Sequence, residues 1–402
     1  MMSKWDMVRL GDVGTIITGN TPKTSDEKNY SSNDLSFIKP SDISEQGVVS
    51  LASSENFISD YARLSCRIVP RNSVLVTCIG IIGKVGVAEI EMAFNQQINA
   101  IVPDDKKCYP RFLAYAIYRA KHEMNHIANA AVVPIINKSQ FSDVQIPLPP
   151  LEEQKKIADI LDRASTLIEK RKAQIAKLDL FVKSQFIAMF GDPVINPMGW
   201  EIKSLQSLIS NGSIMYHLDG NHGELYPKSS EFVSEGVPYI GANCINDGVV
   251  EYTNAKYLSE ERANSFRKGI AINDDVLFAH NATVGPVAIL KTQLPKVILS
   301  TSLTAYRCNE SVLSSYYLKA YMTSTAFVRQ FEADMGQTTR NQVPITKQRE
   351  YNFVLPPLYT QNRFAVFVTE VEKSKAQMQQ ALVQQELLYK SLMQKCFNGE
   401  AI

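Results

Sequence analysis

The chain has 402 residues, of which 45% are hydrophobic and 21% are charged, and its net charge is +1 at pH 7. This length exceeds the usual size of one domain and predicts two or more domains, each large enough to bury a core. The charge alone indicates no polyanionic partner, no apolar run reaches the roughly eighteen residues of a membrane span, and the N-terminus lacks the apolar stretch of a signal peptide. The six scattered cysteines form no Cys-x-x-Cys pair, so we expect reduced thiols in a cytoplasmic protein without a metal site or a membrane partner.

Residues 1–146 predict a first globular domain of mixed strands and helices. Short β-prone runs occur at 34–39, 73–78, 85–90 and 98–102, residues 110–126 have helical apolar spacing, and the polar residues 23–33 predict an exposed loop. This domain carries 15 basic and 15 acidic residues, and residues 198–354 carry 14 and 15. A nucleic-acid surface would therefore require charge sorted onto one face.

The segment His122-Glu123-Met124-Asn125-His126 matches the His-Glu-x-x-His pattern of zinc peptidases, in which two histidines bind the metal and the glutamate acts as base. The pattern is short, and no further ligand follows at the usual spacing. We expect the polar end of a surface helix and keep a zinc peptidase as an alternative. Phosphate-binding and methyltransferase motifs also fail on spacing or on required residues, so the sequence indicates no enzyme.

Residues 147–192 predict one long helix. Leu148-Pro149-Pro150-Leu151 opens it, and no Gly or Pro follows before Phe190. A helix of this length would extend about 55–60 Å. Its apolar side chains recur at spacings of three and four, which is typical of a coiled-coil seam, at Ile157, Leu161, Ala164, Ile168, Ile175, Leu178, Val182 and Met189.

The second half of the chain repeats the first. Residues 193–354 predict a second globular domain, and residues 355–402 a second long helix opened by Leu355-Pro356-Pro357-Leu358. Apolar and glycine positions persist between the two copies, whereas polar positions differ: Lys84 corresponds to Pro286, Cys78 to His280, and Gln96-Gln97 to Thr301-Ser302. Two readers of different targets would differ in this way, but so would copies that diverged neutrally, and both explanations remain open.

The order of globule, helix, globule and helix determines the expected architecture. The first helix leads to the second globule, and pairing of the two apolar seams brings the second helix back toward the first. We expect an α+β fold in each globule, two long helices forming an antiparallel coiled coil, a pseudo-twofold internal repeat, and a C-terminus near the N-terminus.

The stretch Leu148-Pro149-Pro150-Leu151-Glu152-Glu153-Gln154 resembles the element that opens the long helices in specificity (S) subunits of type I restriction–modification enzymes. A more degenerate copy ends at Gln361. Gly19-Asn20-Thr21-Pro22, Ile82-Gly83-Lys84-Val85 and Asp219-Gly220-Asn221-His222-Gly223 also resemble stretches of that family's target-recognition domains. Tyr359-Thr360 replaces the acidic pair of the first copy, which puts individual contacts in doubt.

The resemblance implies a DNA reader without catalysis of its own. Each globule would be a target-recognition domain for one half of a bipartite sequence in double-stranded DNA. The helix pair would set the spacing and dock two modification (methyltransferase) subunits, to which restriction subunits add. S-adenosylmethionine and ATP would belong to those partners, and this chain would bind no cofactor. A coiled-coil interaction scaffold without DNA remains an alternative.

We expect the DNA contacts at polar loop residues that differ between the two copies, because lysine can serve guanine or phosphate and glutamine or asparagine can serve adenine. In the first domain these are Thr21, Lys23, Lys39, Ser41, Lys84, Gln96, Gln97 and Lys138. In the second domain they are Asn221, His222, Asn243, His280, Asn281, Thr283, Arg340, Asn341 and Gln342.

Overall fold

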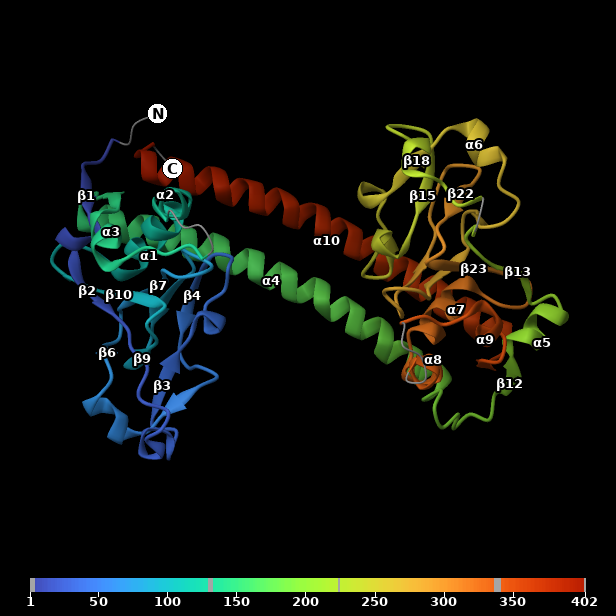
Figure 1. The fold of residues 1–402 in the computed structure, drawn as a ribbon, viewed down its shortest axis with the longest axis horizontal. Helices are drawn as coiled ribbons and strands as arrows, with labels where there is room; N and C mark the ends of the chain where they lie inside the picture. The colour runs from blue at the N-terminus through green and yellow to red at the C-terminus, as the bar shows by residue number, and fades with distance from the viewer. Residues whose placement is uncertain (1–3, 129–132, 223–224, 336–340, 401–402) are drawn as a thin grey trace. The chain divides into compact units, whose positions relative to one another are not determined.

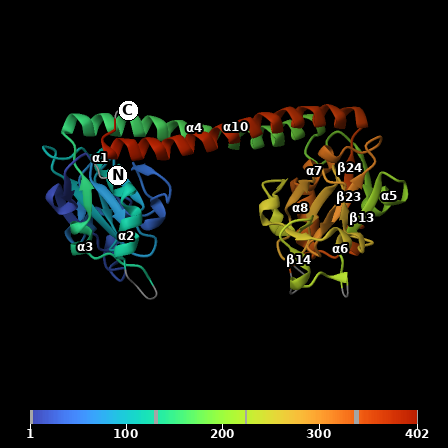
Figure 2. The same ribbon diagram turned by 90° about the horizontal axis from the view of Figure 1, so that it is seen from above.

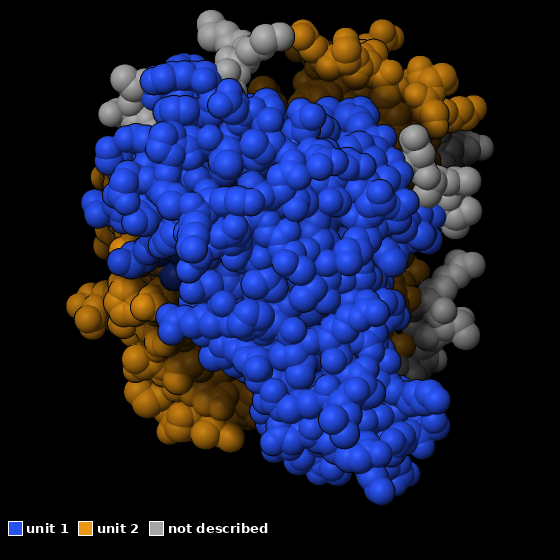
Figure 3. Space-filling model, turned by 90° about the vertical axis from the view of Figure 1, so that its left-hand side faces the viewer, with its two compact units in different colours: residues 1–173, 379–402 blue, residues 174–378 orange. Residues whose placement is uncertain are grey.

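The computed structural model describes residues 4–128, 133–222, 225–335 and 341–400. It divides into two compact units: unit 1 comprises residues 1–173 and 379–402, and unit 2 comprises residues 174–378 (Figure 3). The division falls inside both long helices, α4 (Leu151–Phe190) and α10 (Leu358–Asn398). Each unit therefore combines one globular part with one portion of each helix.

Unit 1 contains a five-stranded sheet, a four-stranded sheet and a strand pair. The first has the order β2 (Gly14–Thr18), β10 (Ile98–Pro103), β7 (Val74–Thr77), β8 (Val85–Ala88) and β4 (Val48–Leu51). The second has the order β5 (Phe57–Ile58), β3 (Leu35–Ile38), β9 (Met92–Phe94) and β6 (Ile68–Val69), and β1 (Met7–Arg9) pairs with β11 (Gln145–Pro147). The four predicted strands of this domain are confirmed as β3, β7, β8 and β10.

The helices of unit 1 correct one expectation. In place of a single helix over residues 110–126, the chain forms α1 (Pro110–Arg119) and α2 (Lys121–Ile127), followed later by α3 (Lys138–Asp143). The break lies at Ala120, where ψ is 1°, outside the helical range. Apolar spacing continues across the break, so the pattern alone could not reveal it. The loop expected at 23–33 also contains a 3₁₀ turn, Glu27–Tyr30, in which Asn29 is buried and donates to Lys23 O.

Unit 2 repeats this layout. One sheet has the order β13 (Ile214–Asp219), β23 (Leu303–Cys308), β20 (Val276–Ala279) and β21 (Val287–Ile289). The other has the order β14 (Phe232–Val233), β18 (Lys256–Leu258), β15 (Val237–Ile240), β22 (Val297–Leu299) and β19 (Ile270–Ala271). The strand pairs are β12 (Glu201–Ser204) with β24 (Asn352–Leu355) and β16 (Ile245–Asn246) with β17 (Val249–Val250). The helices are α5 (Leu205–Ser210), α6 (Glu260–Asn264), α7 (Ser315–Met322), α8 (Thr325–Met335) and α9 (Ile345–Gln348).

The two units share their strand register. In unit 1, Ile101 of β10 lies opposite Ile16 of β2, and in unit 2 Tyr306 of β23 lies opposite His217 of β13. In the second sheet of each unit, one pair of corresponding strands is parallel: β3 with β9 in unit 1 and β15 with β22 in unit 2. The duplication seen in the sequence is therefore a duplication of the fold, and corresponding residues can be assigned from the register.

Within each unit, the portions of α4 and α10 pack against each other in antiparallel directions, as the sequence predicted (Figures 1 and 2). In unit 1, Lys172 forms an ion pair with Glu386 at 3.4 Å, and in unit 2 Lys375 pairs with Asp179 at 2.7 Å. None of the predicted seam positions of α4 is exposed, but residues outside the predicted seam, such as Ala158 and Phe186, are buried as well. The other faces of the helices are largely polar, and no helix in the described ranges has the length and hydropathy needed to cross a membrane.

A buried glutamine near the start of each long helix ties that helix to the globular part of its unit. The Gln154 side chain accepts from Tyr109 N at 2.7 Å and donates to Lys107 O at 2.9 Å and Pro149 O at 2.8 Å. Gln361 accepts from Ser314 N at 2.9 Å in the same way. The glutamine of the Leu-Pro-Pro-Leu-x-x-Gln element thus satisfies backbone groups that burial would otherwise leave unpaired.

Candidate nucleic-acid interface

The polar loops of unit 2 meet at one end of its sheets. The end of β20 continues into Asn281, which forms a bridge with Gln342, and Ala282 N donates to Asn341 O at 3.1 Å. His280 N donates to Ser302 O at 3.0 Å, next to the start of β23. The loop after β15 joins the same group, because Ala242 N donates to the Ser302 hydroxyl at 2.8 Å. Four segments distant in sequence therefore present their side chains together.

The corresponding loops of unit 1 meet in the same way. Thr21, after β2, donates through its hydroxyl to Gln96 Oε1 at 2.7 Å, and both side chains are exposed. Cys78 N donates to Gln97 O at 2.8 Å, as His280 does to Ser302 in unit 2. Gly19 and its counterpart Gly220 allow the close approach of these loops, because a Cβ atom at either position would clash with backbone atoms of the facing loop.

The structure brings most of the predicted residues of unit 1 to this end, but not all of them are free to contact DNA. Thr21, Lys23, Ser41, Gln96 and Lys138 are exposed, whereas Lys39 and Gln97 are half-buried. Lys39 Nζ donates to Asn56 Oδ1 at 2.6 Å. Lys84 is buried, and its ammonium donates to Pro40 O at 3.1 Å, so it is held inside the protein.

The predicted residues of unit 2 divide similarly. The side chains of His222, Asn243, Thr283 and Asn341 are exposed, and those of Asn281 and Gln342 are half-buried. His280 is only 2% exposed and Asn221 only 1%, and Asn221 Nδ2 donates to Lys268 O at 2.6 Å. Arg340 lies outside the described residues. The two buried side chains are placed to support the loops rather than to reach a duplex.

Two cations at these loops were missed by the sequence reasoning. Arg67 is exposed, donates to Thr18 O at 2.7 Å, and its backbone N–H donates to Asn20 Oδ1 at 2.8 Å. Lys268 Nζ lies 3.2 Å from Asp219 Oδ1 in unit 2. Each cation stands shortly before a short strand, β6 or β19, and that repeated position in the two copies is the signal that could have identified them.

Asp219 is a fixed negative charge at the end of unit 2. Burial alone would raise the pKa of its carboxyl group, but hydrogen bonds from His222, at 2.6 Å, and Lys268, at 3.2 Å, outweigh this effect and lower the pKa. The carboxylate therefore orients His222, whose side chain is half exposed, at the mouth of the loops.

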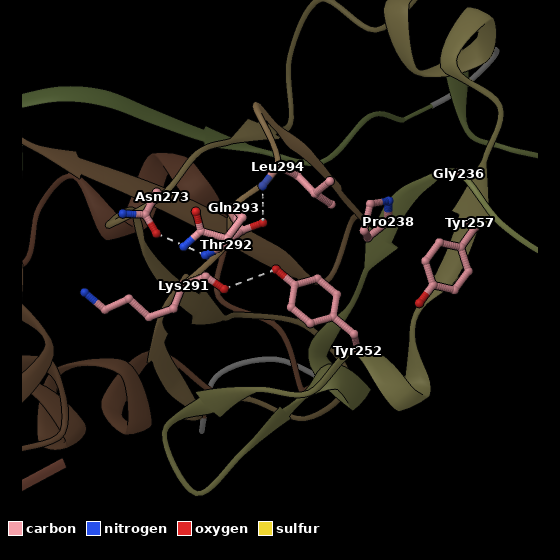
Figure 4. A pocket seen from close by; sticks show the side chains of 9 residues that line it. All are labelled: Gly236, Pro238, Tyr252, Tyr257, Asn273, Lys291, Thr292, Gln293 and Leu294. Carbon is pink, nitrogen blue, oxygen red and sulfur yellow. Dashed lines mark hydrogen bonds between the residues drawn. The ribbon is translucent and has the colours of Figure 1, made fainter. Parts of the chain in front are cut away.

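A pocket of about 600 Å³ lies elsewhere in unit 2, between the β21–β22 loop and β15 and β18 (Figure 4). The Tyr252 hydroxyl donates to Lys291 O at 3.4 Å, and Tyr257 and Leu294 complete an apolar wall. Asn273, which also lines the pocket, precedes β20, whereas the polar loops follow that strand. The pocket includes none of the residues expected to contact DNA.

The His-Glu-x-x-His segment lies on α2, at the surface of unit 1. The rings of His122 and His126 make an edge-to-face contact with centroids 4.4 Å apart. Both side chains and that of Glu123 are exposed. Within the described ranges, no group of three or more histidine, cysteine, aspartate or glutamate side chains is arranged to hold a metal ion.

These features define a class of protein: two related α+β units, each with clustered polar loops at one sheet end, connected through a pair of long helices. A family model of the type I restriction modification DNA specificity domain matches residues 2–178 and again residues 198–386. The chain belongs to this family. Each match covers one copy of the internal repeat and ends within its long helix.

Named relatives agree with this assignment. The MjaIX specificity subunit of Methanocaldococcus jannaschii is 26% identical over 68% of this chain and 65% of its own length. The HindI specificity subunit of Haemophilus influenzae is 29% identical over 43% of this chain and 39% of its own length. The EcoKI specificity subunit of Escherichia coli K12 is 23% identical over 98% of this chain and 89% of its own length. The chain thus spans less than two thirds of the length of the MjaIX and HindI subunits.

Solved structures share the fold. The S subunit of a type I restriction–modification system from M. genitalium superposes with a TM-score of 0.60 at 14% identity, over 98% of this chain and 96% of that one. A chain from a type I system studied for complex assembly and conformational transition superposes with a TM-score of 0.57 over 99% and 98%. The α+β architecture with two long helices predicted from the sequence is therefore confirmed.

Proposed function

We propose that this chain is the DNA-specificity subunit of a type I restriction–modification complex. Each unit reads one half of a bipartite duplex sequence through the loops at the end of its sheets. The chain has no catalytic role of its own and acts in the cytoplasm. Methyltransferase subunits, which bind S-adenosylmethionine, and ATP-dependent restriction subunits supply the chemistry.

One observation carries this proposal: the same scaffold presents different polar side chains at corresponding loop positions. Thr21 in unit 1 corresponds to His222 in unit 2, and Gln97 corresponds to Ser302, while the strand register around them is unchanged. Side chains at base edges specify sequence, whereas a shared scaffold only positions them. A protein that binds two different half-sites requires this combination.

The proposed contacts follow from exposure. The exposed members of the predicted set, together with Arg67 and Lys268, are proposed to contact bases or phosphates. Lys39, Gln97, Asn281 and Gln342 would take part through their exposed edges. Lys84, Asn221 and His280 would hold the loops, because each side chain is buried and has a polar atom hydrogen-bonded to a partner inside the protein. The near-neutral net charge of the chain fits a reader that gains much of its affinity from partner subunits.

The helices are proposed to dock the methyltransferase subunits. Both helices carry large apolar side chains that are exposed, and exposed apolar side chains can mark interaction surfaces. A groove of about 1170 Å³ in unit 1, between β4 and the two helices, adds a concave part to this surface. The exposed apolar residues are Leu167, Leu180, Phe181 and Ile187 on α4, and Val366, Val383, Leu387 and Leu388 on α10.

Selection of binding sites tests the proposal. The full chain, alone and with the methyltransferase subunits of its own system, would be incubated with duplexes of random sequence, and the bound fraction sequenced. We expect two short conserved blocks separated by a fixed number of random base pairs, with much stronger selection when the methyltransferase is present. An interaction scaffold without DNA recognition would enrich no sequence in either arm, and a zinc peptidase would instead contain bound metal.

A further inference from the structure

A buried polar network lies directly beneath the loops of unit 2. Gln348, the last residue of α9, is fully buried, and its Oε1 accepts from the Tyr306 hydroxyl at 2.6 Å and from His217 Nε2 at 3.2 Å. Its Nε2 donates to Thr304 Oγ1 at 3.1 Å, and Thr304 is in turn hydrogen-bonded to His280 Nδ1 at 2.9 Å. The polar network is defined as His217, His280, Thr304, Tyr306 and Gln348.

The polar network is tied to the segments that carry the proposed base contacts. These segments, residues 280–283 and 341–343, are called the reading loop. Gln348 Nε2 also donates to Val343 O at 3.2 Å, and Val343 N donates to His280 O at 2.8 Å. The Gln348 side chain therefore joins the 341–343 segment directly, and the 280–283 segment through Val343 and Thr304, to β13 and β23.

The reading loop needs such support. Ala282, at its tip, has a φ of 65°, in the left-handed region that alanine rarely adopts. Such a conformation persists when the surroundings fix it, and it often occurs at functional sites. Thr283 N donates to Asn281 O at 2.9 Å, which closes the tip into a tight turn. The turn and the bridge to the 341–343 segment fix where Asn281 and Asn341 point.

Unit 1 shows that the fold does not require the polar network. By strand register, His217 corresponds to Ile16, Tyr306 to Ile101 and Thr304 to Asn99. Backbone hydrogen bonds at equivalent positions show that His280 corresponds to Cys78 and that Gln348 corresponds to Phe141. Four of these five positions in unit 1 are thus occupied by Ile16, Cys78, Ile101 and Phe141, which form part of an apolar core. The same scaffold folds with an apolar centre, so the polar network serves something other than folding.

The network is uncharged and incompletely satisfied. Burial lowers the pKa of both His217 and His280 to about 4, so both rings are neutral at pH 7. His217 Nδ1 is buried without a hydrogen-bond partner in the described part of the chain. Gln348 itself is fully satisfied, because its Oε1 accepts two hydrogen bonds and its Nε2 donates two, and a satisfied buried polar network specifies one arrangement of its surroundings.

From these contacts we propose that Gln348 is a positioning residue for DNA reading by unit 2: through the polar network it fixes the reading loop in the one geometry that discriminates bases. This inference rests on the proposed function of the chain. Unit 1 positions its loops without such a network, so the two half-sites depend on different devices.

Site selection with variants of the full complex tests the inference. Gln348→Leu removes the centre of the network, and Tyr306→Phe removes only one hydrogen bond from it. Phe141→Leu alters the corresponding position of unit 1, where no network exists, and serves as the matched control. Each variant would be selected on random duplexes with methyltransferase subunits present, well below its measured melting temperature.

We expect Gln348→Leu to reduce base discrimination about tenfold or more in one half-site and to leave the other half-site and the gap unchanged. Tyr306→Phe should give a smaller loss in the same half-site, and Phe141→Leu none. Equal weakening of both half-sites by Gln348→Leu would indicate a merely structural role and overturn the inference, as would unchanged discrimination in both. If the unaltered complex selects no bipartite sequence, the proposed function fails first. If Gln348→Leu does not fold, Tyr306→Phe decides between the same outcomes.

Discussion

Replacing Gln154 with leucine should destabilise unit 1 through three specific losses. The side chain is fully buried and makes hydrogen bonds to Tyr109 N, Lys107 O and Pro149 O. Leucine fills a similar volume but leaves one buried N–H and two carbonyl groups without these bonds. An unsatisfied buried group costs about 1–3 kcal/mol, and the two carbonyl groups add part of that each, so we expect a total loss of about 3 kcal/mol.

That loss is a large part of the 5–15 kcal/mol that stabilises an ordinary domain. The chain has two tryptophans, and one lies in each unit: Trp5 in unit 1 and Trp200 in unit 2. In a Trp200→Phe background, the fluorescence of Trp5 during urea unfolding therefore reports on unit 1. We expect the midpoint for Gln154→Leu to fall by about 1 M or more, given slopes of roughly 2–3 kcal/mol per molar urea.

Gln394→Leu is the matched control, because it makes the same substitution at an exposed position of α10 within unit 1. Its free energy of unfolding should stay within about 0.5 kcal/mol of that of the parent protein. A Gln154→Leu variant as stable as this control would refute the reasoning. The hydrogen bonds of Gln154 would then contribute nothing to the attachment of the long helix to the globular part of unit 1.

Two further predictions concern buried ionisable side chains. Burial lowers the pKa of His217 and of His280 from the ordinary value of 6.5 to about 4, so between these two pH values the unfolded chain binds more protons than the folded chain. Acidification from pH 7 to pH 4 should therefore remove up to about 3 kcal/mol per histidine from the stability of unit 2. Urea unfolding followed by Trp200 fluorescence in a Trp5→Phe background measures this loss, and His217→Asn should reduce the pH dependence. Asp162→Asn should destabilise unit 1 by about 2–4 kcal/mol, because it leaves the partly buried Arg111 guanidinium without its carboxylate partner. Trp5 fluorescence reports that change, and a loss below about 1 kcal/mol would contradict it.

The long helices were predictable because apolar residues recur along them at regular spacing, and the duplication was predictable because the same sequence motifs occur twice. Seam positions such as Leu161, Ile168 and Val368 are buried where spacings of three and four placed them. The strands followed from short alternating or β-branched runs between turn residues. The break at Ala120 was not predictable, because helical spacing continues through it and only the backbone angle at that residue changes.

The candidate site was predictable only to the level of the loops that form it. Loop positions that differ between the copies do gather at one end of each unit, but side-chain direction depends on tertiary contacts. Lys84 turns inward to Pro40 O, and His280 joins a buried network, although both are polar residues in loops. Arg67 and Lys268 were missed because their neighbours at the site come from strands distant in sequence. Aligning the two copies by strand register would have identified them, because both residues precede equivalent short strands; amino-acid composition could not.

The last prediction concerns the helices as a spacer. Helix α4 has 40 residues and α10 has 41, so each extends about 60 Å. The ion pairs Lys172–Glu386 in unit 1 and Lys375–Asp179 in unit 2 show that the two helices pair within each unit. A heptad inserted in one helix alone would shear the seam, whereas a heptad after Ala173 and another after Gln380 would keep both helices in phase and add about 10 Å.

If the helix pair sets the distance between the half-sites, the double insertion should leave both half-site sequences unchanged and lengthen the gap by about three base pairs, at 3.4 Å each. Three base pairs also rotate one half-site by more than a quarter of a duplex turn relative to the other, so methylation should fall more than binding does. Long-read sequencing of DNA methylated by the variant complex gives half-sites and gap in one measurement, with the single insertion as the control that should lose activity. An unchanged gap with both half-sites intact would mean that contacts other than the helix pair determine the spacing.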